Sequence, residues 1–179
     1  MIELKKIKWI FVLTAILTLG ASEIGFGSAA TIAQAKTVNW QKPSQKKAYP
    51  KLKKGDWLKV NIKKQRVYVM RKKQKKALYT MVCSTGIYNS TPRGTFHIQN
   101  RGKSFYNKSS KEGAKYWTSW LYNGIYLFHT VPTNKKGKYI KSEAKKLGKP
   151  VSHGCIRLTI PDAYWIYKKV PRGTKVHIY

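Results

Sequence analysis

Short segments in which apolar and polar residues alternate are the feature that most constrains the fold of this chain. They begin at residue 57 and recur to the C-terminus, with turn-forming residues between them. Side chains of a β-strand point alternately to its two faces, so this alternation is typical of half-buried strands. The segments expected to be strands are 57–62, 66–70, 78–84, 95–98, 124–130 and 175–178. The chain is therefore predicted to be mainly β.

One clear helix is expected near the C-terminus. Thr159 stands where an N-cap residue belongs, Pro161 falls in the first turn, and Asp162 places a negative charge near the positive end of the helix dipole. The helix is predicted to continue to Lys169, and a second, short helix is expected around residues 142–147. The predicted fold is a mainly β domain with one helix in its C-terminal region.

Residues 100–123 separate two predicted strands and are rich in Gly, Ser and Lys. We expect them to form a long loop, and loops of this length are often binding loops or lids. Two roles are open for the aromatic side chains in this loop: they pack the loop itself, or they cover a substrate cleft. These side chains are Phe105, Tyr106, Tyr116, Trp117, Trp120 and Tyr122.

The N-terminal residues have the pattern of a secretory signal peptide. Three lysines precede the uncharged apolar stretch 10–19, and Ala33 and Ala35 are the small residues that a signal peptidase recognises. The apolar stretch is shorter than the ~20 residues that cross a bilayer, which favours cleavage; an uncleaved anchor is the alternative. We expect a signal peptide over residues 1–35, a basic flexible linker over 36–55 and one folded domain over 56–179.

The positive charge of the chain is extreme and is spread along its length. The sequence has 37 Lys and Arg against 6 Asp and Glu, a formal net charge of +31. Such a charge attracts polyanions, but it does not distinguish nucleic acid, anionic lipid and phosphate-rich wall polymers. A merely solvated basic surface is the alternative. The scarcity of acids argues against one class of enzyme, because a glycosidase needs two cooperating carboxylates.

The two cysteines stand in different contexts. An exported protein with two cysteines suggests a disulfide, yet Cys83 lies in an apolar run typical of a buried strand, where a thiol simply packs. Cys155 lies between Gly154 and an alternating segment, with His153 beside it. A cysteine reacts as its thiolate and needs a nearby base to reach that state. Cys155 is therefore the candidate nucleophile.

Two histidines are candidate bases for Cys155. A catalytic base usually comes from a separate element, which favours His129, at the end of a predicted strand, over His153. No carboxylate is near His129 in sequence, so a backbone carbonyl is expected to orient it. Backbone N–H groups near Gly154 and Cys155 are expected to form an oxyanion hole. No spacing in the sequence supports a zinc site, and no cofactor or metal is expected.

The motifs around these residues resemble the YkuD-type L,D-transpeptidase family. In order, they are Ser84-Thr85-Gly86, the segment TPRGTF at residues 91–96, His129, and SHGCIRL at residues 152–158. The resemblance runs from about Asp56 to Tyr179, and SHGCIRL is its most specific part.

The resemblance implies a β-sandwich-like fold and acyl transfer on peptidoglycan stem peptides. By that likeness, Cys155 attacks the carbonyl before the terminal D-Ala of a tetrapeptide stem, D-Ala leaves, and an amine of a neighbouring stem resolves the thioester as a 3→3 cross-link. His129 is implied as the base and the Thr130 carbonyl as its orienting partner. The residues implied to line the pocket are Ser152, His153, Gly154 and Arg157.

The resemblance also implies a secreted, wall-associated enzyme of a Gram-positive type of bacterium. Its expected partners are peptidoglycan stems and, from the charge, anionic wall polymers such as teichoic acids. Nucleic acid binding and stable membrane insertion after cleavage are not expected. Two alternatives remain: a hydrolase that cuts the same stems with water, and a non-enzymatic cationic wall-binding protein.

The chain departs from the family pattern at two places. The family usually has Gly after the base histidine, whereas here Thr130-Val131-Pro132 follows His129. A lysine-rich insertion, residues 134–149, also lengthens the interval between His129 and Cys155. Both departures concern the rim of the expected site and leave the nucleophile unchanged.

Overall fold

The computed structural model describes residues 37–179, and the predicted signal peptide lies outside them. These residues form one compact unit. Its strands are β1 (Trp57–Asn61), β2 (Arg66–Met70), β3 (Tyr79–Ser84), β4 (Gly94–His97), β5 (Arg101–Asn107), β6 (Glu112–Leu121), β7 (Tyr126–Thr130), β8 (Ile156–Leu158) and β9 (Lys175–Ile178). Its helices are α1 (Lys141–Ala144), α2 (Ile160–Lys169) and the 3₁₀ turn η1 (Ile87–Asn89).

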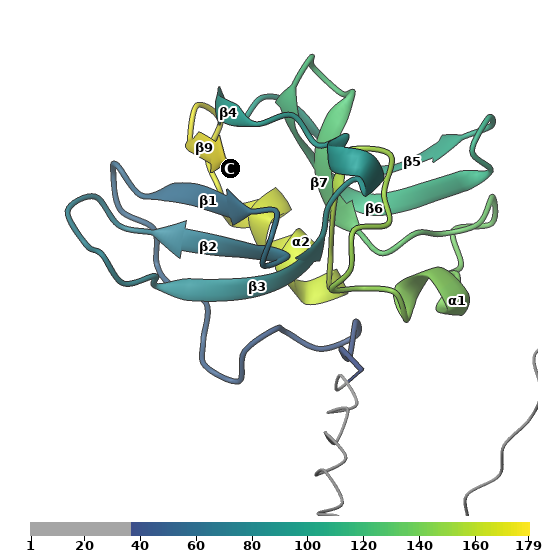
Figure 1. Ribbon diagram of the computed structural model, residues 1–179, viewed down its shortest axis with the longest axis horizontal. Helices are drawn as coiled ribbons and strands as arrows, with labels where there is room; N and C mark the ends of the chain where they lie inside the picture. The colour runs from purple at the N-terminus through teal and green to yellow at the C-terminus, as the bar shows by residue number, and fades with distance from the viewer. Residues whose placement is uncertain (1–36) are drawn as a thin grey trace, which may run out of the picture. The chain divides into compact units, whose positions relative to one another are not determined.

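All nine strands belong to one sheet, in the order β4-β9-β1-β2-β3-β8-β7-β6-β5. The pairs β1–β9 and β7–β8 are parallel, and the others are antiparallel. The sheet curls, because β4 at one end returns to β6, where the rings of Phe96 and Trp120 lie 5.0 Å apart. Figure 1 shows the two halves of the curled sheet, with α2 behind the place where they meet.

The larger of two hydrophobic clusters fills the curl of the sheet. Strands of both halves contribute fully buried side chains, such as Val67 from β2 and Phe128 from β7, and α2 adds Ile166. The Thr159 hydroxyl caps α2 by accepting from the Asp162 N–H at 3.2 Å, as predicted. The prediction of a mainly β fold with a C-terminal helix is confirmed, and α1 lies close to the expected short helix.

The prediction of a long loop over residues 100–123 is wrong. These residues form the hairpin β5–β6, and β6 also pairs with β7. The Gly and Ser content suggested a loop, yet the alternate residues Thr118 and Trp120 are buried against the core and hold β6 in the sheet. Tertiary packing here overrides the local turn-like composition.

The prediction of a flexible linker over residues 36–55 is also wrong for its described part. The Ser44 hydroxyl donates to Asp162 at 2.5 Å and accepts from the Val82 N–H of β3 at 2.8 Å. The hydroxyl of Tyr49 donates to the same carboxylate at 2.6 Å, and its ring stacks on Trp165 at 5.4 Å. Because buried Asp162 needs hydrogen-bond donors, it fixes a segment whose composition alone is that of a tether.

Candidate active site

The turn before β8 carries Cys155, and the Ser-Thr-Gly motif supports it. The Thr85 carbonyl accepts from the N–H groups of Val151 and Ser152 at 2.9 and 3.1 Å. Thr85 is itself held by the buried side chain of Gln65, which donates to its hydroxyl at 2.7 Å and accepts from its N–H at 2.8 Å. Two motifs far apart in sequence therefore build one rigid turn.

Gly154 is required in this turn for two reasons. Its φ of +135° lies in a region that residues with a Cβ rarely adopt. A Cβ there would also lie 2.7 Å from the Tyr126 ring and 2.9 Å from the Ser90 carbonyl oxygen. The Thr91 hydroxyl, the first residue of the TPRGTF motif, donates to the Gly154 carbonyl at 2.9 Å and accepts from the Gly86 N–H at 2.7 Å.

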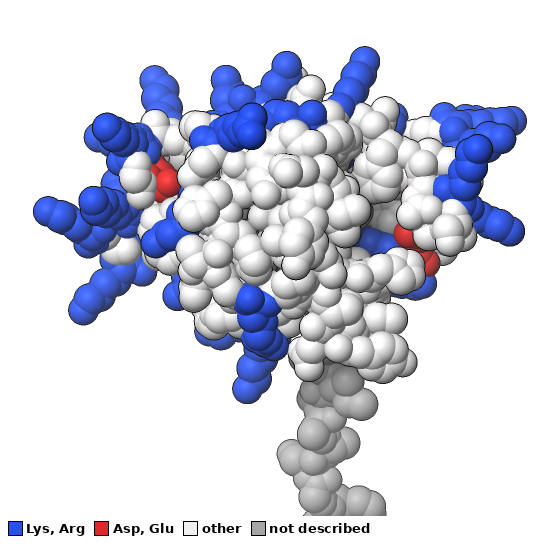
Figure 2. Space-filling view, turned by 90° about the horizontal axis from the view of Figure 1, so that it is seen from above, with Lys and Arg blue, Asp and Glu red and all other residues white. Residues whose placement is uncertain are grey.

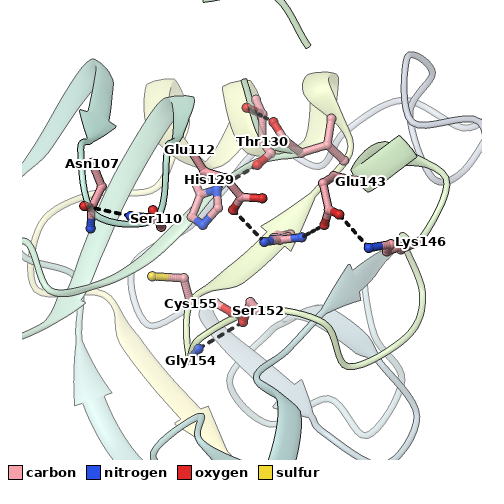
Figure 3. A network of polar contacts seen from close by, with 12 residues as sticks. Asn107, Ser110, Glu112, His129, Thr130, Glu143, Lys146, Ser152, Gly154 and Cys155 are labelled. Atoms are coloured by element: carbon pink, nitrogen blue, oxygen red, sulfur yellow. Dashed lines mark hydrogen bonds and ion pairs between the residues drawn. The ribbon is translucent and has the colours of Figure 1, made fainter. Parts of the chain in front are cut away.

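Ser152 shapes the turn from within. Its hydroxyl donates to the Cys155 carbonyl at 2.6 Å and accepts from the Gly154 N–H at 3.1 Å (Figure 3). The Gly154 N–H is thereby occupied, which corrects the expectation that it is an oxyanion donor. Ser152 lines the cleft, but these bonds give it a role in holding Cys155 in place.

His129 and Cys155 come together because β7 and β8 are parallel neighbours in the sheet. His129 pairs with Arg157, two residues after Cys155. Its Nδ1 lies 2.7 Å from the Thr130 carbonyl oxygen, as the sequence predicted. A carbonyl only accepts hydrogen bonds, so Nδ1 carries the proton and Nε2 keeps its lone pair. In Figure 3, the His129 ring points toward the Cys155 thiol.

The electrostatic setting keeps both groups uncharged at neutral pH. Burial and the nearby Arg157 charge lower the pKa of His129 to about 4, although the bond to Thr130 opposes this. Burial raises the pKa of the Cys155 thiol above its ordinary value, against a hydrogen bond from the Leu127 backbone. The resting pair is therefore thiol and neutral imidazole, with the imidazole ready to accept a proton.

The pair opens into a cleft of about 540 Å³. The hairpin β5–β6 forms one wall, and Phe105 packs edge-on against the His129 ring with centroids 5.8 Å apart. Exposed His153 lines the cleft on the side of the nucleophile turn. The aromatic-rich segment thus does border a cleft, through Phe105 and Trp117, although as strands and not as a loop.

A buried ion-pair network beside the cleft was not foreseen from the sequence. The Arg157 guanidinium, only 4% exposed, donates to Glu112 of the hairpin and to Glu143 of α1, each at 2.9 Å. Glu143 is also bonded to Lys146 at 2.5 Å. The network joins the hairpin and the lysine-rich insertion to β8 (Figure 3). The sequence held one signal of this network. With so few carboxylates among so many Lys and Arg side chains, each carboxylate is expected to form ion pairs.

The other sites considered from the sequence were a disulfide, a metal site and a membrane anchor. Cys83 is fully buried in β3, and burial raises the pKa of its thiol. Both cysteines are free. Within residues 37–179, no group of three His, Cys, Asp or Glu side chains is arranged to hold a metal ion. In the same range, no helix is long and apolar enough to cross a membrane.

Comparison with protein families and curated proteins gives a consistent result. The family model YkuD, described as the L,D-transpeptidase catalytic domain, matches residues 55–178. A Bacillus subtilis (strain 168) protein named "Putative L,D-transpeptidase YciB" is 48% identical over 151 residues, which cover 80% of this chain and 76% of that protein.

Solved structures share the fold. A fused Zn-dependent amidase/peptidase/peptidoglycan-binding domain-containing protein from Clostridium acetobutylicum is 29% identical, with a TM-score of 0.53 over 76% of this chain. An L,D-transpeptidase from Mycobacterium smegmatis is 20% identical, with a TM-score of 0.56 over 70% of this chain. The chain covers only 56% and 58% of those two solved chains.

Proposed function

The chain belongs to the YkuD family of L,D-transpeptidase catalytic domains, and on that premise we propose that it forms 3→3 cross-links between peptidoglycan stems through a thioester on Cys155. The observation that carries the proposal is that Cys155 lines the same cleft as a neutral His129 whose Nδ1 lies 2.7 Å from the Thr130 carbonyl oxygen. This arrangement supports His129 as the base and Cys155 as the nucleophile, because both side chains line the same cleft.

Acylation begins with proton transfer during attack. Because the thiol and the imidazole are both uncharged at rest, His129 Nε2 takes the thiol proton as the sulfur bonds to the carbonyl carbon before D-Ala. The carbon–nitrogen bond then breaks, and the leaving D-Ala amine takes the proton back from His129. The enzyme is left as a thioester with neutral His129.

Resolution of the thioester reverses these roles. The acceptor amine gives a proton to His129 as its nitrogen bonds to the thioester carbon. The carbon–sulfur bond breaks, and the Cys155 sulfur takes the proton from His129. One amide bond is lost and one is formed, so the cross-link needs no external energy source. Water in place of the amine gives hydrolysis by the same residues.

Mass spectrometry of defined tetrapeptide stems tests the proposal. Incubation with the protein is expected to release D-Ala and to give a cross-linked dimer, and Cys155→Ala is expected to give neither. A shortened tripeptide without any dimer supports the hydrolase instead. If neither the protein nor the variant changes the stems, and no adduct forms on Cys155, both enzymatic functions are contradicted.

We further propose that the protein is exported by cleavage of residues 1–35 and is held in the wall by anionic polymers. Lys and Arg side chains project around the rim of the face in Figure 2, while its centre is free of them, which suits contact with a flexible polyanion. Retention on purified walls is expected to fall as the salt concentration rises, because salt screens exposed charges. Retention that is independent of salt contradicts this proposal.

A further inference from the structure

Carboxylates are scarce in this protein, and almost all of them are fully paired. Residues 37–179 contain four acidic side chains. Asp56 is held by Arg71 and the Lys53 N–H, and Asp162 by the hydroxyls of Ser44 and Tyr49. Glu143 uses one oxygen for Lys146 and the other for Arg157. None of these three carboxylates lines the cleft.

Glu112 differs from the other three. One carboxylate oxygen, Oε2, accepts from Arg157 at 2.9 Å. Its second oxygen, Oε1, has no hydrogen-bond partner among residues 37–179. The side chain is 24% exposed and lines the cleft that holds Cys155 and His129. Figure 3 shows the Glu112 carboxylate near the His129 ring, and both residues line the cleft.

The backbone around Glu112 is fixed. The next residue, Gly113, exchanges hydrogen bonds with Thr133 at 2.7 and 2.8 Å. A Cβ at Gly113 would lie 2.3 Å from the Phe105 carbonyl oxygen, so the strands approach too closely for any other residue. Arg157 holds the carboxylate of Glu112 at the other end of this side chain. The carboxylate is therefore preorganised, which lowers the entropic cost of binding a ligand.

The acyl acceptor poses an electrostatic problem for this enzyme. A primary amine is an ammonium ion at neutral pH, and a protein with a net charge of +31 repels it. We propose that Glu112 binds the ammonium group of the acceptor stem through Oε1 and so makes the cleft selective for a cationic amine acceptor. This inference rests on the proposed transpeptidation, and it names the acceptor subsite of the same cleft.

The proton balance of the step is complete. The ammonium nitrogen loses one proton to neutral His129 and attacks the thioester as the free amine, and a second proton leaves the nitrogen as the amide forms. The Cys155 sulfur takes one of these protons on departure, and solvent takes the other. Glu112 stays ionised throughout: it holds the amine near the thioester and is a specificity-determining residue, not the base.

The test compares Glu112→Gln with Glu143→Gln. Each variant removes one carboxylate from Arg157, but only the first removes a carboxylate from the cleft. The readout is the ratio of cross-linked dimer to hydrolysed tripeptide, measured beside total D-Ala release. Glu112→Gln is expected to lower the ratio about tenfold, because a charged hydrogen bond to the acceptor is lost. Glu143→Gln is expected to change the ratio by less than about twofold.

A second arm replaces the stem amine with hydroxylamine, a nucleophile that is uncharged at neutral pH. The ratio of hydroxamate to tripeptide is expected to be the same in Glu112→Gln as in the wild type. An equal fall of the dimer ratio in both variants, or an equal loss with hydroxylamine, overturns the proposal, because Glu112 then acts only through Arg157. Absence of D-Ala release from the wild type instead contradicts the proposed function itself.

Discussion

Cys83 lies in β3 and Cys155 in the turn before β8, the strand that pairs with β3, yet only Cys155 is placed for the proposed reaction. Cys83 of β3 pairs with Leu158 of β8, three residues after Cys155. Both thiols have a raised pKa, so acidity does not distinguish them. The difference lies in the neighbours: Cys155 lines an open cleft with His129, whereas Cys83 is enclosed by the core. In the proposed mechanism, access and an adjacent base, and not an acidic thiol, make Cys155 the nucleophile.

The largest effect is expected from replacing the two cysteines one at a time. Cys155→Ala removes the sulfur that forms the thioester in the proposed mechanism, so cross-linking is expected to fall by about 10⁴-fold or more. Cys83→Ala removes one buried sulfur, so the free energy of unfolding falls by about 1 kcal/mol and activity stays within about twofold. Activity assays and urea unfolding of both variants check this. Comparable activity losses would break the contrast between the two sites.

The next effect concerns the base. His129→Gln leaves a polar side chain of similar size but removes the proton acceptor, and we expect acylation to slow by about 10²–10⁴-fold. His153→Gln, the matched control on the exposed side of the same cleft, is expected to slow acylation far less. Single-turnover release of D-Ala measures both rates. A larger loss of rate in His153→Gln would indicate that His153, in the turn that carries Cys155, is the base instead of His129.

A third prediction probes the contacts by which residues 44 and 49 dock on α2. Asp162→Ala leaves the part-buried hydroxyl donors of Ser44 and Tyr49 without their acceptor, and we expect the free energy of unfolding to fall by about 4 kcal/mol. Tyr49→Phe removes one of these bonds and is expected to cost about 1 kcal/mol. Urea unfolding measures both, and protease digestion reports release of the segment. Unchanged stability of Asp162→Ala would instead indicate that residues 37–55 are a loose linker.

The smallest effect is a pH dependence of stability that comes from His129 in the active site. The pKa of His129 is about 4 in the folded protein and about 6.5 in the unfolded chain, so the unfolded state binds more protons between these values. The stabilising contribution is fully present above pH 6.5 and is lost as the pH falls toward 4, by about 3 kcal/mol in all. Activity is expected to keep its acid limb near pH 4.

Unfolding measured at pH 7 and at pH 4.5 checks the pH dependence, with His129→Gln as the control. The variant lacks the titrating group, so its stability should fall less over the same interval. An acid limb of activity near pH 6.5 would show that His129 titrates as an ordinary exposed histidine and would contradict the buried, neutral base.

Local pattern predicted much of this molecule, and packing decided the rest. Alternation located β1 to β4, β7 and β9, and the N-cap Thr159 located α2, because strand and helix periodicity depend only on neighbours in sequence. Composition misled at residues 100–123, where burial of Trp120 makes a strand from loop-like residues. It also misled at residues 37–55, where the contacts to Asp162 come from 113 to 118 residues away.

The site divides in the same way. The contact of His129 with the Thr130 carbonyl was predicted, because the lack of carboxylates near His129 in sequence indicates a carbonyl partner. The motifs also indicated Cys155, which lines the same cleft, and its role as nucleophile stays a prediction. The Glu112–Arg157–Glu143 network was not predicted, because its members lie 14 and 45 residues apart and meet only when β6, β8 and α1 pack together. The occupied Gly154 N–H depends on the Ser152 rotamer, which no sequence pattern specifies.

The most direct test of the central claim is to locate the acyl group on the protein. The protein is incubated with a tetrapeptide donor without acceptor, quenched in acid and digested, and the peptides are mapped by mass spectrometry. The account predicts a tripeptide thioester on the peptide that contains Cys155, an unmodified Cys83 peptide, and no adduct in Cys155→Ala. An acyl group on Cys83, or D-Ala release with no adduct on Cys155, would contradict it.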